Sequence, residues 1–192
     1  MEQMKIVCFG DSNTYAHDPR SYFGSRFPAE ERWVNILSEK MGCTVVNVGE
    51  NGREIPRSRW EVAEFKRMLA GEKPIDLLIV MLGTNDLLQG CAVPEVVKRM
   101  EIFLDQVDLD LHNVLLVAPP ILQAGEWVPS EELVIASKNL NEAYKQLAFR
   151  LDVQFANAGD WEIPLAFDGV HLTKEGHSAF AEGLFRYLNK GE

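Results

Sequence analysis

The sequence predicts an α/β fold in which a five-stranded parallel sheet is covered by helices on both faces. Five short apolar segments alternate with five segments of helical periodicity along the 192 residues. One apolar segment, residues 75–82, is nearly continuous in apolar side chains, which is typical of a strand buried on both faces. Polar residues gather in the loops after these segments, where such sheets bind their ligands.

The first half of the chain contains two strand–helix pairs. Residues 5–9 (KIVCF) form a short apolar run, and residues 31–41 (ERWVNILSEKM) have helical spacing after a long loop. Residues 43–48 (CTVVNV) are short and β-branched, which predicts a strand. Residues 57–71 predict a helix that stops at Gly71.

The second half continues the alternation after the central strand. Apolar residues at helical spacing predict helices over residues 93–107, 133–151 and 173–187. Residues 113–118 (NVLLVA) predict a fourth strand, and residues 153–158 (VQFANA) a weaker fifth. Each strand is followed by a helix, so the crossovers are right-handed and the sheet is parallel.

Composition indicates a globular protein with 46% apolar and 25% charged residues. We expect one domain over residues 1–192, because no repeat or linker divides the chain. The net charge of −10 would repel a phosphate backbone, so we expect no nucleic-acid partner. No apolar stretch is long enough to cross a bilayer, and the first residues leave no room for a secretory signal, so no membrane partner is expected.

The cysteines indicate a reducing compartment. Cys8, Cys43 and Cys91 are odd in number and lack C-x-x-C spacing, which favours reduced thiols over disulfides or a zinc site. We therefore expect a cytoplasmic protein.

Ser12 follows the first strand, in the stretch FGDSNTY, and could be either a turn residue or an exposed nucleophile. A serine hydroxyl needs a base to take its proton, and the chain has four histidines. His112 precedes a strand, at the opposite end of the sheet. His177 falls within the closing helix, where we expect a surface or packing role. His17 shares the loop of Ser12 and could touch a ligand. His171 follows the fifth strand, at the same end of the sheet as Ser12.

Asp168 stands three residues before His171, in DGVH. A short loop of this length can fold the carboxylate back to the imidazole, which fixes the tautomer and leaves the other nitrogen facing Ser12. The same pair could be an incidental turn. It could also ligate a metal together with His17 and Asp18, but a metal site needs more ligands, and we expect none.

Acyl transfer also needs donors for a developing oxyanion. Asn85, in GTND, carries a side-chain amide at the end of the third strand. The loop GENG contains Gly49 and Gly52, where a backbone N–H can approach a ligand closely. Taken singly, each of these residues also fits ordinary loop chemistry.

Four blocks of the sequence together resemble the SGNH hydrolases, also called GDSL-type esterases and lipases. They are FGDSN (9–13), NVGENG (47–52), GTND (83–86) and DGVH (168–171), and they occur in the family's order. The resemblance implies a flavodoxin-like three-layer α/β/α sandwich that needs no cofactor and no metal. It implies a serine esterase that hydrolyses small carboxylic esters, with acetyl or short acyl groups on sugars or aryl alcohols, through an acyl-serine intermediate.

By this resemblance, Ser12, Asp168 and His171 form the catalytic triad. The oxyanion hole would consist of the backbone N–H groups of Ser12 and Gly52 and the side chain of Asn85. The acyl and alcohol groups of the substrate stay open, and thioesters remain among the alternatives.

Two details of the second block remain open. Gly49 could supply the donor in place of Gly52, although Gly52 sits deeper in the loop beside Arg53. Tyr15, Arg53 and Val170 adjoin the blocks, and we expect them to contact the substrate.

The chain departs from the family pattern after the serine, where many members have leucine and then glycine but this chain has Asn13 and Ala16. The long loop from Thr14 to Pro28 and the phrase RFPAEERWVNIL resemble the small arylesterase branch, which includes oligomers and so leaves a homo-oligomer open.

Two rival functions use the same scaffold. A flavin- or nucleotide-binding protein could cradle a phosphate with the DSNT turn, but the chain has no G-x-G-x-x-G or Walker loop. A non-catalytic binding module is the other alternative, because fold alone does not fix function.

Overall fold

The computed structural model describes residues 3–21 and 25–189, so three residues of the long loop after the first strand lie outside the described part. Its centre is a sheet of five parallel strands in the order β2-β1-β3-β4-β5. The strands are β1 (Lys5–Gly10), β2 (Thr44–Gly49), β3 (Leu77–Met81), β4 (Val114–Ala118) and β5 (Gln154–Asn157).

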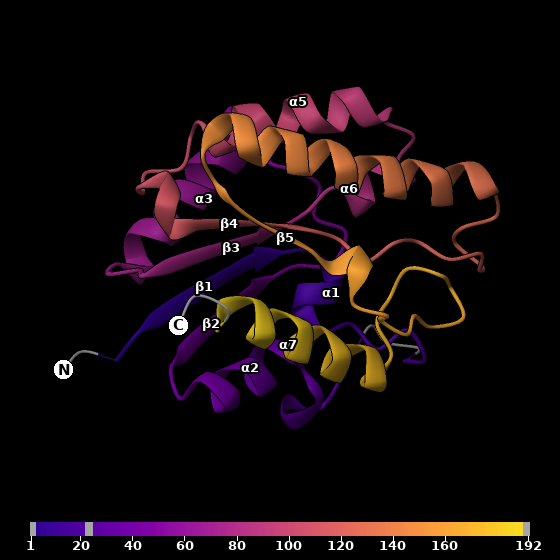
Figure 1. Cartoon of the computed structure of the whole chain (residues 1–192), viewed down its shortest axis with the longest axis horizontal. Coiled ribbons are helices and arrows are strands. Elements are labelled where there is room, and N and C mark those ends of the chain that lie inside the picture. The colour runs from indigo at the N-terminus through magenta and orange to yellow at the C-terminus, as the bar shows by residue number, and fades with distance from the viewer. Residues whose placement is uncertain (1–2, 22–24, 190–192) are drawn as a thin grey trace.

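Helices cover both faces of the sheet, which confirms the predicted fold class (Figure 1). The longer helices are α2 (Trp33–Met41), α3 (Arg59–Glu72), α5 (Val93–Leu104), α6 (Glu131–Leu151) and α7 (Lys174–Leu188). Figure 1 shows α3, α5 and α6 on one face and α2 and α7 on the other. The short helices are α1 (Ser12–Tyr15) and α4 (Thr84–Leu88), and 3-10 turns span Ala29–Glu31, Leu111–Asn113 and Ala158–Asp160.

The alternation of side chains along β1 builds both halves of the core. Val7 and Phe9 point into the cluster under α3, α5 and α6. Ile6 and Cys8 point the other way, into the cluster under α2 and α7. A strand directs successive side chains to opposite faces, so a strand that is apolar throughout must be covered on both sides.

Local sequence signals set the ends of the helices. The Ser58 side chain accepts the N–H of Glu61, whose own side chain accepts the N–H of Ser58, and this capping box starts α3. Gly42 ends α2 with a φ of 60°, a left-handed conformation that glycine adopts without strain. The helix expected over residues 31–41 begins only at Trp33, because a 3-10 turn precedes it.

The order of the strands decides where a ligand can bind. From β1 the chain runs out to the edge strand β2 and then returns to β3, on the other side of β1. The carboxyl ends of these three strands lie side by side, since Gly10 is in register with both Gly49 and Met81. Open α/β sheets bind ligands at such a reversal of strand order.

Within the described residues, no helix is both long and apolar enough to cross a membrane.

Candidate active site

Ser12 lies where β1 turns into the short helix α1, as that helix's first residue. Asp11 caps the helix, because its Oδ1 accepts the N–H of Asn13 at 2.9 Å. Gly10 must lack a side chain, since a Cβ there would lie 2.1 Å from Thr14 Oγ1. This tight turn holds the Ser12 hydroxyl at the carboxyl edge of the sheet.

Asp168 and His171 lie in the loop that leads into α7. Oδ1 of Asp168 accepts the backbone N–H groups of Val170 and His171, both at 2.9 Å. Its Oδ2 lies 2.7 Å from His171 Nδ1, and His171 Nε2 lies 3.0 Å from Ser12 Oγ. The structure therefore brings the three predicted side chains into one hydrogen-bonded chain that runs from carboxylate through imidazole to hydroxyl.

Hydrogen bonds keep the Asp168 carboxyl group in its charged form. Burial by itself would raise the pKa of Asp168, but the hydrogen bonds from the His171 ring and from backbone N–H groups outweigh it and lower the pKa. A carboxylate only accepts hydrogen bonds, so Nδ1 of His171 carries the proton. Nε2 is left free to accept the hydroxyl proton of Ser12.

The two glycines of the loop after β2 have different surroundings. The N–H of Gly49 donates to Asn47 Oδ1 at 2.9 Å, and a Cβ on Gly49 would lie 2.1 Å from Tyr15 N. Gly52 is exposed and has a φ of 73°. This difference favours Gly52 over Gly49 as a donor to a ligand, because the N–H of Gly49 is already engaged by the protein.

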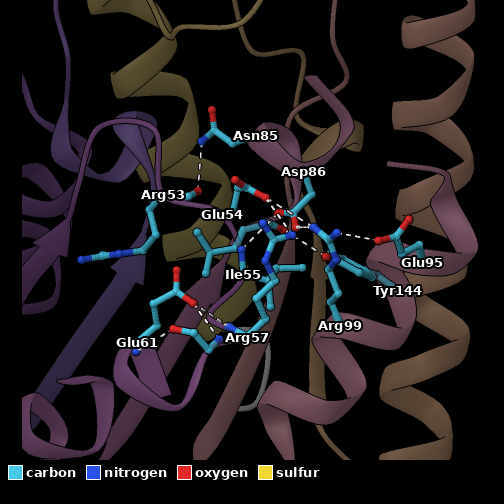
Figure 2. A network of polar contacts seen from close by, with 12 residues as sticks. Arg53, Glu54, Ile55, Arg57, Glu61, Asn85, Asp86, Glu95, Arg99 and Tyr144 are labelled. Carbon is cyan, nitrogen blue, oxygen red and sulfur yellow. Dashed lines mark hydrogen bonds and ion pairs between the residues drawn. The ribbon is translucent and has the colours of Figure 1, made fainter. Parts of the chain in front are cut away.

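Asn85 lies on α4, directly after β3. Its Nδ2 donates to the carbonyl oxygen of Arg53 at 3.0 Å (Figure 2). The bond joins α4 to the loop of Gly52, so the two candidate donors are held in a fixed relation to each other.

A buried ion pair connects α4 and the loop of Gly52 to α5. Asp86, the neighbour of Asn85, is fully buried, and its two oxygens accept from Ile55 N at 3.1 Å and from Arg99 Nη1 at 2.9 Å. Figure 2 shows Arg99 pointing at Asp86, and Arg99 also pairs with Glu54 and Glu95. The hydrogen bond to Asp86 raises the pKa of Arg99, which stays charged.

The arrangement agrees with a known family. The sequence model of the GDSL-like lipase/acylhydrolase family matches residues 8–179, nearly the whole chain. The chain belongs to this family. The match spans every loop described above and confirms the resemblance. No curated protein sequence matches this GDSL-like hydrolase.

Solved structures of esterases share the fold over nearly their full length. An inhibitor-bound aryl esterase from M. smegmatis has a TM-score of 0.83 and 25% identity, and the alignment covers 96% of this chain and 98% of that one. Est24, a carbohydrate acetylesterase from Sinorhizobium meliloti, has a TM-score of 0.81 and 27% identity, with 97% and 98% covered.

Together, the family match and these neighbours show that this GDSL-like hydrolase is a serine hydrolase of small carboxylic esters. None of them favours a flavin- or nucleotide-binding protein.

The Arg53 side chain of this GDSL-like hydrolase, expected at the substrate, is directed at the protein itself. Its guanidinium donates to Gly10 O at 2.8 Å and to Val48 O, and pairs with Glu50 at 2.6 Å. It also lies over the Phe9 ring, 4.3 Å from the ring centroid. Burial lowers the pKa of Arg53. These contacts cap the carbonyl ends of β1 and β2 and anchor the loop that carries Gly52.

Tyr15 and Val170 also contact other residues of the protein. The guanidinium of Arg26 lies 4.3 Å from the Tyr15 ring centroid, and its Nε donates to Tyr15 O at 2.6 Å. Val170 is buried against Leu122 and Val128. The Val170 side chain is therefore packed into the protein, whereas the half-buried Tyr15 ring lies against the Arg26 guanidinium.

A groove of about 600 Å³ runs between β2 and α3. Gly52 and Arg53 line it, but Ser12 and His171 do not. Ser12 and His171 are therefore not part of the wall of this groove.

Two aromatic rings flank the His171 imidazole. The His17 ring lies 4.7 Å from it and the Trp127 ring 5.1 Å, between centroids. Trp127 is 52% exposed, and its backbone N–H donates to the carbonyl oxygen of Asp168 at 3.0 Å. His17 was a candidate ligand contact from the sequence, whereas Trp127 was not predicted. The available signal was a tryptophan in a long loop after the fourth strand, yet only the folded chain brings it to His171.

Proposed function

We propose that Ser12 is the nucleophile of this esterase, that His171 is its general base and acid, and that Asp168 orients the imidazole. One observation carries the proposal: the Asp168–His171–Ser12 chain has separations of 2.7 and 3.0 Å at the switch point of the sheet. Such a constellation is recognised by geometry and not by position in the sequence.

The reaction would proceed in two halves. Ser12 Oγ attacks the ester carbonyl carbon while His171 Nε2 takes the hydroxyl proton. The tetrahedral intermediate then releases the alcohol, which receives that proton, and the acyl group remains on Ser12. A water molecule gives a proton to His171, attacks the acyl carbon and releases the acid as Ser12 regains its proton.

The oxyanion would be held by the backbone N–H groups of Ser12 and Gly52 and by Asn85 Nδ2. The Asn85–Arg53 hydrogen bond supports this assignment, because it fixes the amide relative to the glycine loop before any substrate arrives. Preorganised donors of this kind stabilise the charge that develops in the tetrahedral state.

The substrate would be an acetyl or short acyl ester of an aryl alcohol or a sugar. Trp127 and Phe167, both exposed, lie on the adjoining segments that border His171. Flat aromatic faces suit a ring in the alcohol part of the ester. The two structural neighbours named as an aryl esterase and a carbohydrate acetylesterase support the same choice.

The decisive experiment uses a fluorophosphonate probe and Ser12→Ala. The probe should label Ser12 covalently, and the alanine variant should lose both labelling and ester hydrolysis. Ser38→Ala, which removes a half-buried hydroxyl on α2, is the matched control and should stay active. Hydrolysis by Ser12→Ala at the wild-type rate would exclude the assignment.

The alcohol part is tested by comparing phenyl acetate and an acetylated sugar with ethyl acetate. We expect Trp127→Ala to lower kcat/KM for the ring esters by about 10-fold, the scale of one lost aromatic contact, while ethyl acetate changes little. Phe149→Ala, which removes an aromatic ring 90% exposed on α6, is the control. Equal losses on all three esters would argue against stacking by Trp127.

We also propose a cytoplasmic location, supported by the three free cysteines. A homo-oligomer remains a proposal that light scattering of the purified protein would test.

A further inference from the structure

We propose that Asn13 is a positioning residue that holds the two halves of the triad in register, an inference that rests on the proposed roles of Ser12 and His171. Asn13 directly follows Ser12 on α1. Its Nδ2 donates to Val170 O at 3.0 Å, and its Oδ1 accepts the N–H of Leu172 at 2.9 Å. The amide thus forms hydrogen bonds with the backbone on both sides of His171.

These two contacts require both ends of an amide. The Val170 carbonyl needs a donor and the Leu172 N–H needs an acceptor, so they fix which end of the Asn13 side chain points where. Leucine offers neither group. An aspartate would accept from Leu172 but would set a carboxylate oxygen against the Val170 carbonyl.

Asn13 projects from a backbone that is itself anchored. Its N–H donates to Asp11 Oδ1 at 2.9 Å, and its carbonyl accepts Trp33 Nε1 at 2.9 Å. Trp33 is fully buried in the layer formed by α2 and α7. The side-chain amide therefore reaches the histidine loop from a fixed base.

The loop that carries His171 has its own internal supports. Besides the bonds to Asp168 Oδ1, Ala166 N donates to His171 O at 2.7 Å and Trp127 N donates to Asp168 O at 3.0 Å. None of these bonds reaches α1. Among the hydrogen bonds of the described residues, those that join this loop to α1 are the two from Asn13 and the His171–Ser12 contact itself.

The two contacts of His171 therefore depend on different parts of the structure. The Asp168–His171 pair is built within one loop and survives without Asn13, whereas the Ser12–His171 separation depends on the amide. A misplacement of about 1 Å at a reacting group can lower the rate about 100-fold. Loss of Asn13 should therefore lower kcat and change KM little, because no substrate contact is removed.

The test compares Asn13→Leu with Asn141→Leu. Asn141 is an equally buried asparagine on α6, 4% exposed like Asn13, and its Nδ2 donates to Pro119 O and Asn157 Oδ1, both at 2.9 Å. We expect Asn13→Leu to lower kcat about 10- to 100-fold with a nearly unchanged KM, and Asn141→Leu to keep kcat. The low-field proton resonance of the His171 Nδ1–H bond to Asp168 should persist in Asn13→Leu.

Two results would overturn the proposal. One is a folded Asn13→Leu variant with wild-type kcat. The other is a loss of kcat together with the low-field resonance, since the amide would then support the loop as a whole. If Asn13→Leu does not fold, Asn13→Asp, which keeps the volume, should show the same loss of kcat on the alkaline plateau of its pH profile, and wild-type kcat there would also overturn it.

Ser12→Ala keeps the two proposals separate. Activity that survives Ser12→Ala refutes the proposed function. An inactive Ser12→Ala beside a fully active Asn13→Leu refutes only the positioning role.

Discussion

The Asn85 side chain has two N–H groups on one nitrogen, and the structure engages that nitrogen with the carbonyl of Arg53. We expect Asn85→Ala to lower kcat by about 10²- to 10³-fold, because the variant lacks the proposed oxyanion donor. Steady-state kinetics on phenyl acetate measures the loss, and KM should change far less than kcat.

Asn113→Ala is the control for Asn85→Ala. Asn113 is exposed and lies in the turn before β4, at the opposite edge of the sheet. It should keep full activity. A folded Asn85→Ala enzyme with the wild-type kcat would remove Asn85 from the oxyanion hole.

Single residues also mark the limit of what the sequence could predict. The sequence was sufficient to identify Ser12, Asp168 and His171 as candidates, because each stands in a short block that follows a strand. It could not separate Gly49 from Gly52, since that choice depends on a hydrogen bond from Gly49 to Asn47 that only the folded loop displays.

At the scale of the elements, strong periodicity was sufficient to predict the long helices and the strands. Short helices could not be predicted in this way. All five strands and the five longer helices lie close to their predicted ranges. The helices α1 and α4 were expected as loops, because four or five residues are too few for a periodic pattern. Asp86 belonged to a recognised block, but its ion pair with Arg99 depends on how α5 packs against α4.

That ion pair should make α5 essential for the stability of α4 and of the loop that carries Gly52. We expect Arg99→Leu to lower the free energy of unfolding by about 3 kcal/mol, because it leaves the Asp86 carboxylate buried without its cation. Urea denaturation measures the change. Arg57→Leu, which breaks an exposed pair with Glu54, should cost less than about 1 kcal/mol.

A double variant separates the charge from the packing. Asp86→Asn combined with Arg99→Leu removes the unpaired charge while the asparagine can still accept the N–H of Ile55. It should therefore be more stable than Arg99→Leu alone. If the double variant is no more stable, the loss reflects the packing of Arg99, and the buried charge contributes little.

At the scale of the whole molecule, the sequence predicted which edge of the sheet carries the candidate site. It did not predict how deeply the layer of α2 and α7 buries its polar side chains. His177 was expected to have a surface or packing role on the closing helix. The structure buries it completely between α2 and the long loop, where Trp33 N donates to its Nδ1 at 3.4 Å and the Phe27 ring lies 5.1 Å away. Burial lowers the pKa of His177 from 6.5 to about 3.

His177 should make the folded protein sensitive to acid. Below pH 6.5 the unfolded chain takes up a proton at this histidine, whereas the folded protein takes it up only near pH 3. Falling pH therefore favours unfolding. Between pH 6.5 and 5 this group should remove about 2 kcal/mol of stability, at about 1.4 kcal/mol for each pH unit. Asp11 acts in the opposite direction, because burial raises its pKa from 3.8 to about 6 and the folded protein keeps that proton as the unfolded chain releases it.

The comparison of wild type with His177→Asn isolates the histidine, since Asp11 and all other groups are common to both proteins. The asparagine can still accept from Trp33 N, so the pH-independent loss should be small. Urea unfolding at pH 7 and pH 5 should show the wild type losing about 2 kcal/mol more than the variant. Parallel losses in the two proteins would mean that His177 titrates normally in the folded state, and that the layer between α2 and α7 admits water or charge at this point.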